Sequence, residues 1–423
     1  MSPEIHPDSI TGVFVFPAGL RRGTLHWNPE NGLIGGFSVA KSAAKTSESI
    51  LIFPGFIDLH IHAREDTTGR DNYKEDFISV SRAALHGGVV HVADMPNNPV
   101  PPVDEASYAA KEKLLAKADI GITLYAGVGP ETSPLQREVP YKAYMGPSIG
   151  ELFFADQDQL DKALSRYPGR YVSFHCEDPE ILSAHKHESL HELRRPPAAE
   201  IVSTRFAIAM IRKYKLHGKL CHYSTREGLA LINAARAEGV DVTCEVTPHH
   251  LFFDESHLTP SSRPWLQMNP PLRSKADREH LLQALKDGRI DYLATDHAPH
   301  TCAEKEKGIS GVPHLDTYGA FVAWLIRSRG FAPQDVLPFC CENPARFLKP
   351  FLSKSYGLGL GRLETGYRAD LTVLDLSRPW TPTRADLKTK CAWSPFENIA
   401  LPGRVSATII AGKMHRQDGA RLV

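Results

Sequence analysis

The chain has 423 residues, of which 42% are hydrophobic and 23% are charged, and these are ordinary values for a globular protein. Lysine plus arginine and aspartate plus glutamate both number 49, so the formal net charge is zero and we expect no nucleic-acid partner. No apolar run approaches the roughly 20 residues of a membrane helix, so we also expect no membrane partner.

The seven cysteines are scattered and none forms a CxxC pair, which argues for a reducing compartment and against a disulfide framework. The first residues, MSPEIHPDSITGVFVF, lack the basic segment and the apolar core of a signal peptide. We therefore predict a cytoplasmic protein.

Residues 1–52 show no helical period and contain Gly and Pro turns, so we interpret them as the first part of a small β domain. From Phe56 onwards, short apolar runs alternate with helix-like segments. The runs are apolar enough to be parallel strands that are buried on both faces. The eight candidate strands are FIDLHIH (56–62), VVHVADMP (89–96), ITLYAGV (122–128), YKAYMG (141–146), YVSFHCED (171–178), KLCHYST (219–225), VTCEVTP (242–248) and IDYLATDHA (290–298).

The alternation of strands and helices predicts an α/β protein with a (β/α)8 TIM-like barrel, which we place at residues 53–350. Helix-like segments between the strands include AAEIVSTRFAIAMIRKYK and KADREHLLQALKDG. After residue 351, the runs ADLTVLDL (369–376) and VSATIIAGKM (405–414) return to a strand pattern. We expect residues 351–423 to complete the small β domain, which would then be built from both chain termini.

In such a barrel the chemistry lies at the C-terminal ends of the strands, and six polar residues collect there in this sequence. A single histidine at a strand end is usually structural, but so many ligand types at the same end of five strands favour a metal site. Imidazole and carboxylate suit zinc-like ions, and this number of ligands suits two ions with a shared hydroxide. A lysine ammonium does not bind metal, so the lysine fits only as a carbamate formed with CO2. The six residues are His60, His62, Lys142, His175, His222 and Asp296.

Several motifs resemble those of the amidohydrolase superfamily and, within it, most closely the dihydroorotases. The opening PGFIDLHIHARED is similar to the HxHxR motif of the first barrel strand, and DMPNNPVPP is similar to the MPNxxPP stretch. YKAYMGPSIGEL resembles the strand with the carboxylated lysine and the loop after it. CEVTPHHLFF, MNPPLR and ATDHAPHT are close to family signatures, and the resemblance runs from about Pro54 to the C-terminus.

The resemblance implies an enzyme that reversibly cyclises N-carbamoyl-L-aspartate to L-dihydroorotate and water in pyrimidine biosynthesis. It implies two divalent metal ions of the zinc type and a CO2-derived carbamate on the lysine that bridges them. The inner ion would be bound by His60, His62 and Asp296, and the outer ion by His175 and His222.

The resemblance also implies the roles of the catalytic and substrate-binding residues. Asp296 would be the catalytic residue, a general base that takes a proton from the bridging hydroxide and then acts as an acid toward the leaving nitrogen. Arg64 would pair with the α-carboxylate of the substrate, with Asn97 and His300 as its partners. Asn269 would hydrogen-bond to oxygens of the ring or the carboxylate.

Two other interpretations stay open. The chain could be another cyclic amidohydrolase, a dihydropyrimidinase (hydantoinase) or an allantoinase, although the substrates of those enzymes lack the exocyclic carboxylate that Arg64 would bind. It could instead be a non-catalytic scaffold homologue, although such proteins typically lose metal ligands and all six candidates are present here.

The resemblance further implies a small-molecule substrate, a homodimer and, as an option, a non-covalent association with aspartate transcarbamoylase. Ser148 and Ile149 stand in the family's substrate-sensing loop. His314 stands where glycine is usual, and it would be strained if that position needs a positive φ.

Overall fold

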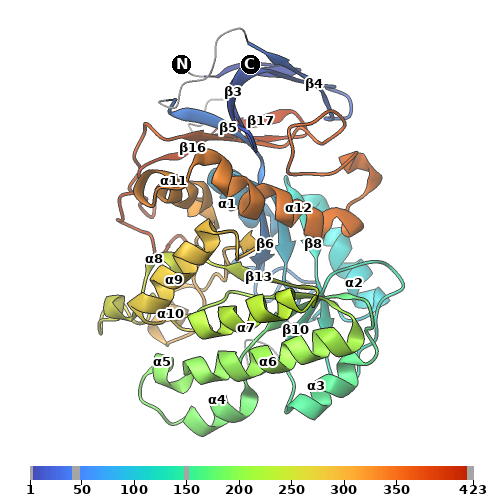
Figure 1. Cartoon of the computed structure of the whole chain (residues 1–423), viewed down its shortest axis with the longest axis vertical. Coiled ribbons are helices and arrows are strands. Elements are labelled where there is room, and N and C mark those ends of the chain that lie inside the picture. Colours follow the sequence, from blue (N-terminus) through green and yellow to red (C-terminus); the bar gives the residue numbers. More distant parts are fainter. Residues whose placement is uncertain (1–2, 41–47, 147–151, 417–423) are drawn as a thin grey trace.

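A barrel of parallel strands forms the centre of the computed structural model, which describes residues 3–40, 48–146 and 152–416 (Figure 1). One run of strands is β6-β7-β8 and the other is β9-β10-β11-β12-β13-β14. The runs meet where the backbone N–H of Tyr125 donates to the carbonyl of Asp94, and where Ile61 forms a parallel bridge with His297. The strands are β6 (Phe56–Ile61), β7 (Val89–Asp94), β8 (Gly121–Leu124), β9 (Ala126–Val128), β10 (Tyr141–Tyr144), β11 (Tyr171–His175), β12 (His217–Leu220), β13 (Val242–Val246) and β14 (Tyr292–Leu293).

Only Tyr125 separates β8 from β9, so these two strands occupy one position and the barrel has the (β/α)8 arrangement that the sequence predicts. The strand ends differ from the prediction in detail. His222 and Asp296 lie beyond the last residues of β12 and β14, and Arg64 lies beyond β6. Each of these three residues has a positive φ, which ends the extended backbone.

Helices cover the outside of the barrel (Figure 1). Several begin at a side chain that accepts a hydrogen bond from the first turn, as Asp76, Thr225 and Ser274 do, which fixes where the chain leaves the loop. The helices are α1 (Phe77–Gly87), α2 (Glu105–Glu112), α3 (Gln157–Leu164), α4 (Pro179–His185), α5 (His191–Arg194), α6 (Pro197–Tyr214), α7 (Arg226–Ala237), α8 (Pro248–Phe252), α9 (Lys275–Lys286), α10 (Cys302–Glu306), α11 (Tyr318–Ser328) and α12 (Asn343–Leu348).

A second sheet, at the top of Figure 1, joins strands from both ends of the chain. Its order is β17-β16-β15-β5-β2-β3-β4, with β1 paired to β2. β5 pairs with β15 in antiparallel orientation and with β2 in parallel orientation, and it leads directly into the barrel. The strands are β1 (Glu4–His6), β2 (Ser9–Phe16), β3 (Gly19–Trp27), β4 (Ile34–Val39), β5 (Ile50–Pro54), β15 (Leu371–Asp375), β16 (Arg404–Ile410) and β17 (Lys413–Arg416).

This sheet confirms a small β domain built from both termini. It has its own apolar cluster, which includes Phe14, Leu25, Ile52 and Ile409, separate from the larger cluster of the barrel. The exact division of the chain at residues 53 and 351 stays a proposal.

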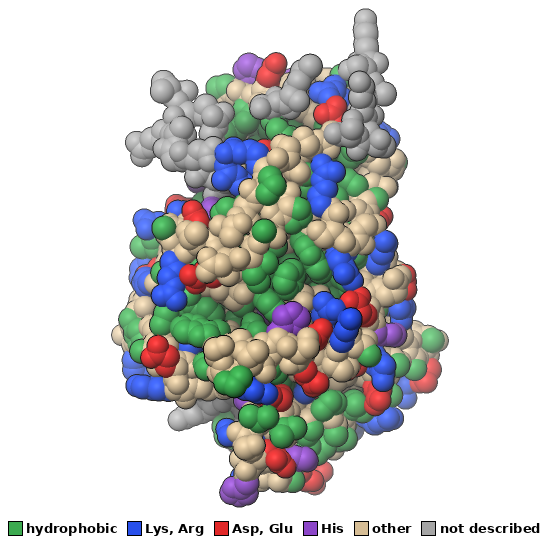
Figure 2. All heavy atoms as spheres, turned by 90° about the vertical axis from the view of Figure 1, so that its left-hand side faces the viewer, with side chains coloured by type: hydrophobic (Ala, Val, Ile, Leu, Met, Phe, Trp, Pro, Cys, Tyr) green, Lys and Arg blue, Asp and Glu red, His purple; other side chains and the backbone are tan. Residues whose placement is uncertain are grey.

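Positive and negative side chains are interspersed on the face of the molecule in Figure 2, with hydrophobic side chains between them. Across the described ranges, no helix is both long enough and apolar enough to cross a membrane.

Candidate active site

The predicted site residues come together at the C-terminal end of the barrel. His60, Lys142 and His175 lie on β6, β10 and β11, while the other predicted ligands follow the ends of their strands. One pocket there is lined by most of the predicted residues, namely His60, His62, Arg64, Asn97, His175, His222, Asn269 and Asp296. Tyr144, which the sequence analysis did not single out, also lines this pocket.

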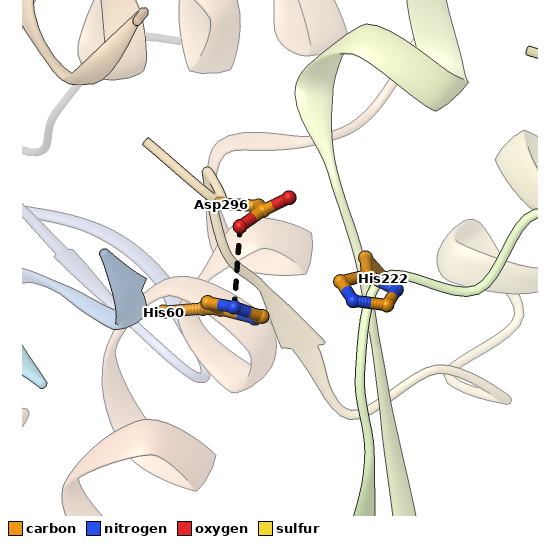
Figure 3. A group of neighbouring side chains, drawn as sticks. All are labelled: His60, His222 and Asp296. Atoms are coloured by element: carbon orange, nitrogen blue, oxygen red, sulfur yellow. Dashed lines mark ion pairs between the residues drawn. The ribbon is translucent and has the colours of Figure 1, made fainter. Parts of the chain in front are cut away.

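The nitrogen and oxygen donors form two groups that face each other. In the first group, Nε2 of His60 and Nε2 of His62 lie 3.2 and 3.0 Å from Oδ1 of Asp296. In the second group, Nδ1 of His175 lies 2.9 Å from Nε2 of His222. Figure 3 shows His60 and Asp296 on one side and His222 opposite, and one donor atom from each of these three lies within 4.8 Å of the others.

The other ring nitrogen of three of these histidines is held by a hydrogen bond. His60 Nδ1 donates to Glu245 on β13, His62 Nδ1 donates to Oδ1 of Asn97 at 2.7 Å, and His175 Nε2 donates to Glu177 at 2.8 Å. Such partners fix the tautomer and aim the remaining lone pair at the pocket. Neither glutamate is predicted from the sequence, although a charged residue inside the apolar run VTCEV is a signal for Glu245.

Burial sets the charge state of the donors. It lowers the pKa of His60, His62 and His222 well below the ordinary value and also lowers that of His175, so these imidazoles are neutral and can bind metal. Burial also raises the pKa of Asp296 to about 7. Neutral imidazoles beside a carboxylate fit divalent ions of the zinc type.

Lys142 is completely buried and is not among the residues that line the pocket. Its Nζ donates to the Sγ of Cys221 at 2.8 Å, and it lies 5.3 Å from the centre of the Tyr144 ring. His60 and Cys221 also form, with Glu245, a second group of possible metal donors. Lys142 therefore lies beside the donor groups, in surroundings with little water.

The backbone is in the left-handed region at three residues of the site. Arg64 has a φ of 60°, His222 of 39° and Asp296 of 49°. Side chains other than glycine rarely adopt this conformation, and such strain is concentrated at functional sites because the surrounding structure has to enforce it. The three turns direct these side chains into the pocket although each lies beyond its strand.

Arg64 is a buried cation in the pocket wall, with 3% of its surface exposed. Its Nη2 donates to Nε2 of His300 at 3.2 Å, and its Nε has no hydrogen-bond partner among the described residues. No carboxylate of the described part of the chain forms an ion pair with it. Oδ1 of Asn269, another pocket residue, is also buried without a partner. The pocket therefore presents hydrogen-bonding groups that a polar ligand can satisfy.

Two loop features were predicted to depart from the family, the residue at His314 and the loop with Ser148 and Ile149, and the structure describes the first. His314 has a φ of −156° and Nε2 3.0 Å from Nδ1 of His249, so the strain that a positive φ would bring does not arise there. Within residues 311–317, the positive φ, 128°, belongs to Gly311. Ser148 and Ile149 lie outside the described residues.

Comparison with known proteins gives the family. The model of the amidohydrolase family matches residues 51–415. A dihydroorotase of Pyrococcus furiosus is 33% identical over 375 residues, which cover 88% of this chain and 83% of that protein. A dihydroorotase of Thermococcus kodakarensis is 32% identical over 417 residues, with 96% and 94% covered.

Solved structures with the same fold include two hydantoinases. The L-hydantoinase (dihydropyrimidinase) of Arthrobacter aurescens has a TM-score of 0.85 at 22% identity, with 97% of this chain and 96% of that chain covered. The D-hydantoinase (dihydropyrimidinase) of a Thermus species has a TM-score of 0.81 at 21% identity, with 97% and 95% covered. The chain belongs to the amidohydrolase family and is a hydrolase that acts on a cyclic amide.

Proposed function

We propose that the protein is a dihydroorotase, which closes N-carbamoyl-L-aspartate to L-dihydroorotate and water and catalyses the reverse hydrolysis. The observation that carries this proposal is the buried guanidinium of Arg64, which lines the pocket without an ion pair to a carboxylate of the described residues. A buried charge is costly unless an opposite charge compensates it, so the pocket favours an anionic substrate. The dihydroorotase relatives support the choice of that substrate.

Some residues of the pocket would bind the substrate, and Asp296 would transfer the proton. Arg64 would hold the carboxylate next to the ring, with Asn97, Asn269 and His300 as further hydrogen-bonding groups. Asp296, whose pKa burial raises to about 7, would take the proton of the attacking water and return it to the leaving ring nitrogen.

Two zinc ions would supply polarisation of the carbonyl group and acidification of the attacking water. His60, His62 and Asp296 would hold one ion, and His175 and His222 would hold the other. The support is that the donor atoms lie close together in each group: Nε2 of His60 and of His62 within 3.2 Å of Oδ1 of Asp296, and Nδ1 of His175 2.9 Å from Nε2 of His222. Lys142, as a carbamate, would bridge the two ions. The scattered cysteines support a cytoplasmic location, and the resemblance alone supports a homodimer and a non-covalent association with aspartate transcarbamoylase.

The test measures metal content and hydrolysis of L-dihydroorotate by the purified protein and by Arg64→Met. Loss of one charge-assisted hydrogen bond costs about 1.5–3 kcal/mol, so we expect KM for dihydroorotate to rise roughly 10- to 100-fold. Arg70→Met is the matched control, because it removes an exposed positive charge from the same loop and should leave KM unchanged.

Dihydrouracil, which has the same ring but no carboxylate, separates the alternatives. A dihydroorotase should prefer dihydroorotate strongly, and Arg64→Met should abolish that preference. If the wild-type protein hydrolyses dihydrouracil or allantoin and leaves dihydroorotate intact, the proposal is wrong and another cyclic amide is the substrate. If it binds no metal and hydrolyses no cyclic amide, the scaffold interpretation gains support.

A further inference from the structure

Tyr144 is the last residue of β10 and lies in the wall of the pocket. It follows Lys142 by two residues, so both side chains point to the same face of the strand. Only 3% of its surface is exposed, and the centre of its ring lies 6.1 Å from that of His175. The phenol therefore stands beside the donor groups of the site.

The hydroxyl group of Tyr144 is buried and has no hydrogen-bond partner among the described residues. Other buried tyrosines of the barrel differ in this respect. Tyr108 donates to the carbonyl of Leu124 at 3.1 Å, and Tyr318 donates to that of Leu293 at 2.9 Å. Leaving a buried hydroxyl unpaired costs about 1–3 kcal/mol. Because the unpaired hydroxyl of Tyr144 lies in a pocket, we infer that a bound ligand supplies its hydrogen-bond partner.

The position of β10 indicates which part of the ligand this is. In the strand order β6-β7-β8/β9-β10, the strand of Tyr144 lies three positions from β6, whose end carries Arg64. Arg64 and His300 form a pair at their own side of the pocket. Tyr144 neighbours Lys142 and His175, two of the residues that would act on the amide under attack. A phenol O–H is a donor, and the carbonyl oxygen of that amide is an acceptor.

We propose that Tyr144 donates its phenolic hydrogen to the carbonyl oxygen of the ring amide under attack. In the hydrolytic direction, the oxygen of water forms a bond to the amide carbon and the electron pair of the C=O π bond moves to the carbonyl oxygen. The C–N bond then breaks, and the nitrogen receives the proton that water has lost. Tyr144 keeps its proton throughout and stabilises the negative charge while it lies on the carbonyl oxygen. The role makes Tyr144 a catalytic residue.

Tyr144→Phe tests this role because it removes one oxygen atom and keeps the ring. Removal of one donor to such an oxygen lowers kcat by roughly 100- to 1000-fold. We expect that loss in kcat with an unchanged metal content and a KM within about threefold of the wild-type value. Tyr108→Phe is the control, since it removes a buried hydroxyl that bonds to the backbone outside the pocket. It should leave kcat unchanged.

Three results would overturn the proposal. An unchanged kcat would show that the hydroxyl does not meet the developing charge. A rise in KM alone would mean that Tyr144 binds substrate and transition state equally well. A loss of metal in parallel with kcat would make it a support of the metal centre.

The proposal rests on hydrolysis of a cyclic amide and not on which amide it is. If the wild-type protein hydrolyses dihydrouracil but not dihydroorotate, the proposed function fails, while the same comparison of Tyr144→Phe with Tyr108→Phe on dihydrouracil still decides the role of Tyr144.

Discussion

The proposed reaction depends on Asp296 more than on any other single residue. Its Oδ1 contacts Nε2 of both His60 and His62, and its carboxylate would transfer the proton from the attacking water to the leaving nitrogen. Asp296→Asn keeps the shape of the side chain and one oxygen that can bind a metal ion, but the amide cannot accept a proton near neutral pH. We expect kcat to fall by roughly 100- to 10,000-fold, the usual contribution of a general base, with most of the metal retained. Asp316→Asn, at a buried carboxylate that binds the backbone of Lys388, should leave kcat unchanged. Wild-type turnover by Asp296→Asn would contradict the assigned role.

The histidines of the site could be predicted one by one from the sequence, because each follows an apolar run and parallel strands bring their ends together. The residues that orient them could not. Glu177 and Glu245 reach His175 and His60 through contacts that depend on side-chain direction in the folded barrel. In the sequence, Tyr144 is one of several aromatic residues in predicted strands, and nothing distinguishes it. Only the structure shows that its hydroxyl is buried without a partner in the described chain.

At the level of elements, the loop after α10 shapes the pocket through its backbone. Nζ of the buried Lys305 donates to the carbonyls of Gln267, Ile309 and Gly311 at 2.7–2.8 Å, and so holds three points of the chain together. The amide of Gly311 also donates to the carbonyl of Gln267 at 2.9 Å. This clamp places Gly311 in the pocket wall, next to His300.

Gly311→Ala should distort this wall. Gly311 has a φ of 128°, and an added Cβ would lie 2.7 Å from the carbonyl oxygen of Ala298 and 3.0 Å from Cδ2 of His300. We expect a loss of about 1–3 kcal/mol in stability together with a raised KM, because the backbone at Ala298 and the ring of His300, the partner of Arg64, have to shift. Gly308→Ala is a matched control: its φ is also positive, at 77°, but its Cβ would meet nothing closer than 3.8 Å. It should cost stability and leave KM unchanged, so equal KM values in the two variants would refute the steric argument. Thermal unfolding and steady-state kinetics measure both effects.

The elements themselves follow from hydrophobic pattern, since all eight predicted barrel strands are present. Their ends do not follow from it. Predicted run 290–298 contains only the two-residue strand β14, because the chain turns at Asp296 into a conformation that no periodicity encodes. The chain also turns at Arg64, beyond the end of β6, so Arg64 lines the same pocket as His60 although it is not part of the strand.

On the scale of the whole molecule, the sequence predicts a β domain from both termini but not its order. β5 lies between β2 and β15, more than 300 residues apart in the chain, and one strand pairing is parallel while the other is antiparallel. Such pairings depend on long-range packing, which a single sequence does not display.

The molecule also buries many histidines, and this should make it sensitive to acid. His91 on β7 lies far from solvent, with Nε2 2.9 Å from Oγ1 of Thr123, and burial lowers its pKa from 6.5 to about 3. Between these two values the unfolded chain binds a proton that the folded chain does not, so the free energy of unfolding falls as the pH drops below 6.5. One such histidine contributes a slope of up to about 1.4 kcal/mol per pH unit.

His91→Gln removes this titrating group and keeps a side chain that can hydrogen-bond to Thr123. Between pH 6.5 and 4.5, the slope of unfolding free energy against pH should therefore decrease by close to one proton, as measured by urea unfolding of the metal-free protein. The remaining buried histidines, among them His249 and His250, keep the rest of the acid sensitivity, because burial lowers their pKa values as well. The same change at the exposed His187, which stays in contact with water, should leave the slope as it is. If the His91 variant keeps the full wild-type slope, then protonation of this buried ring does not contribute to acid unfolding, and other buried groups account for the slope.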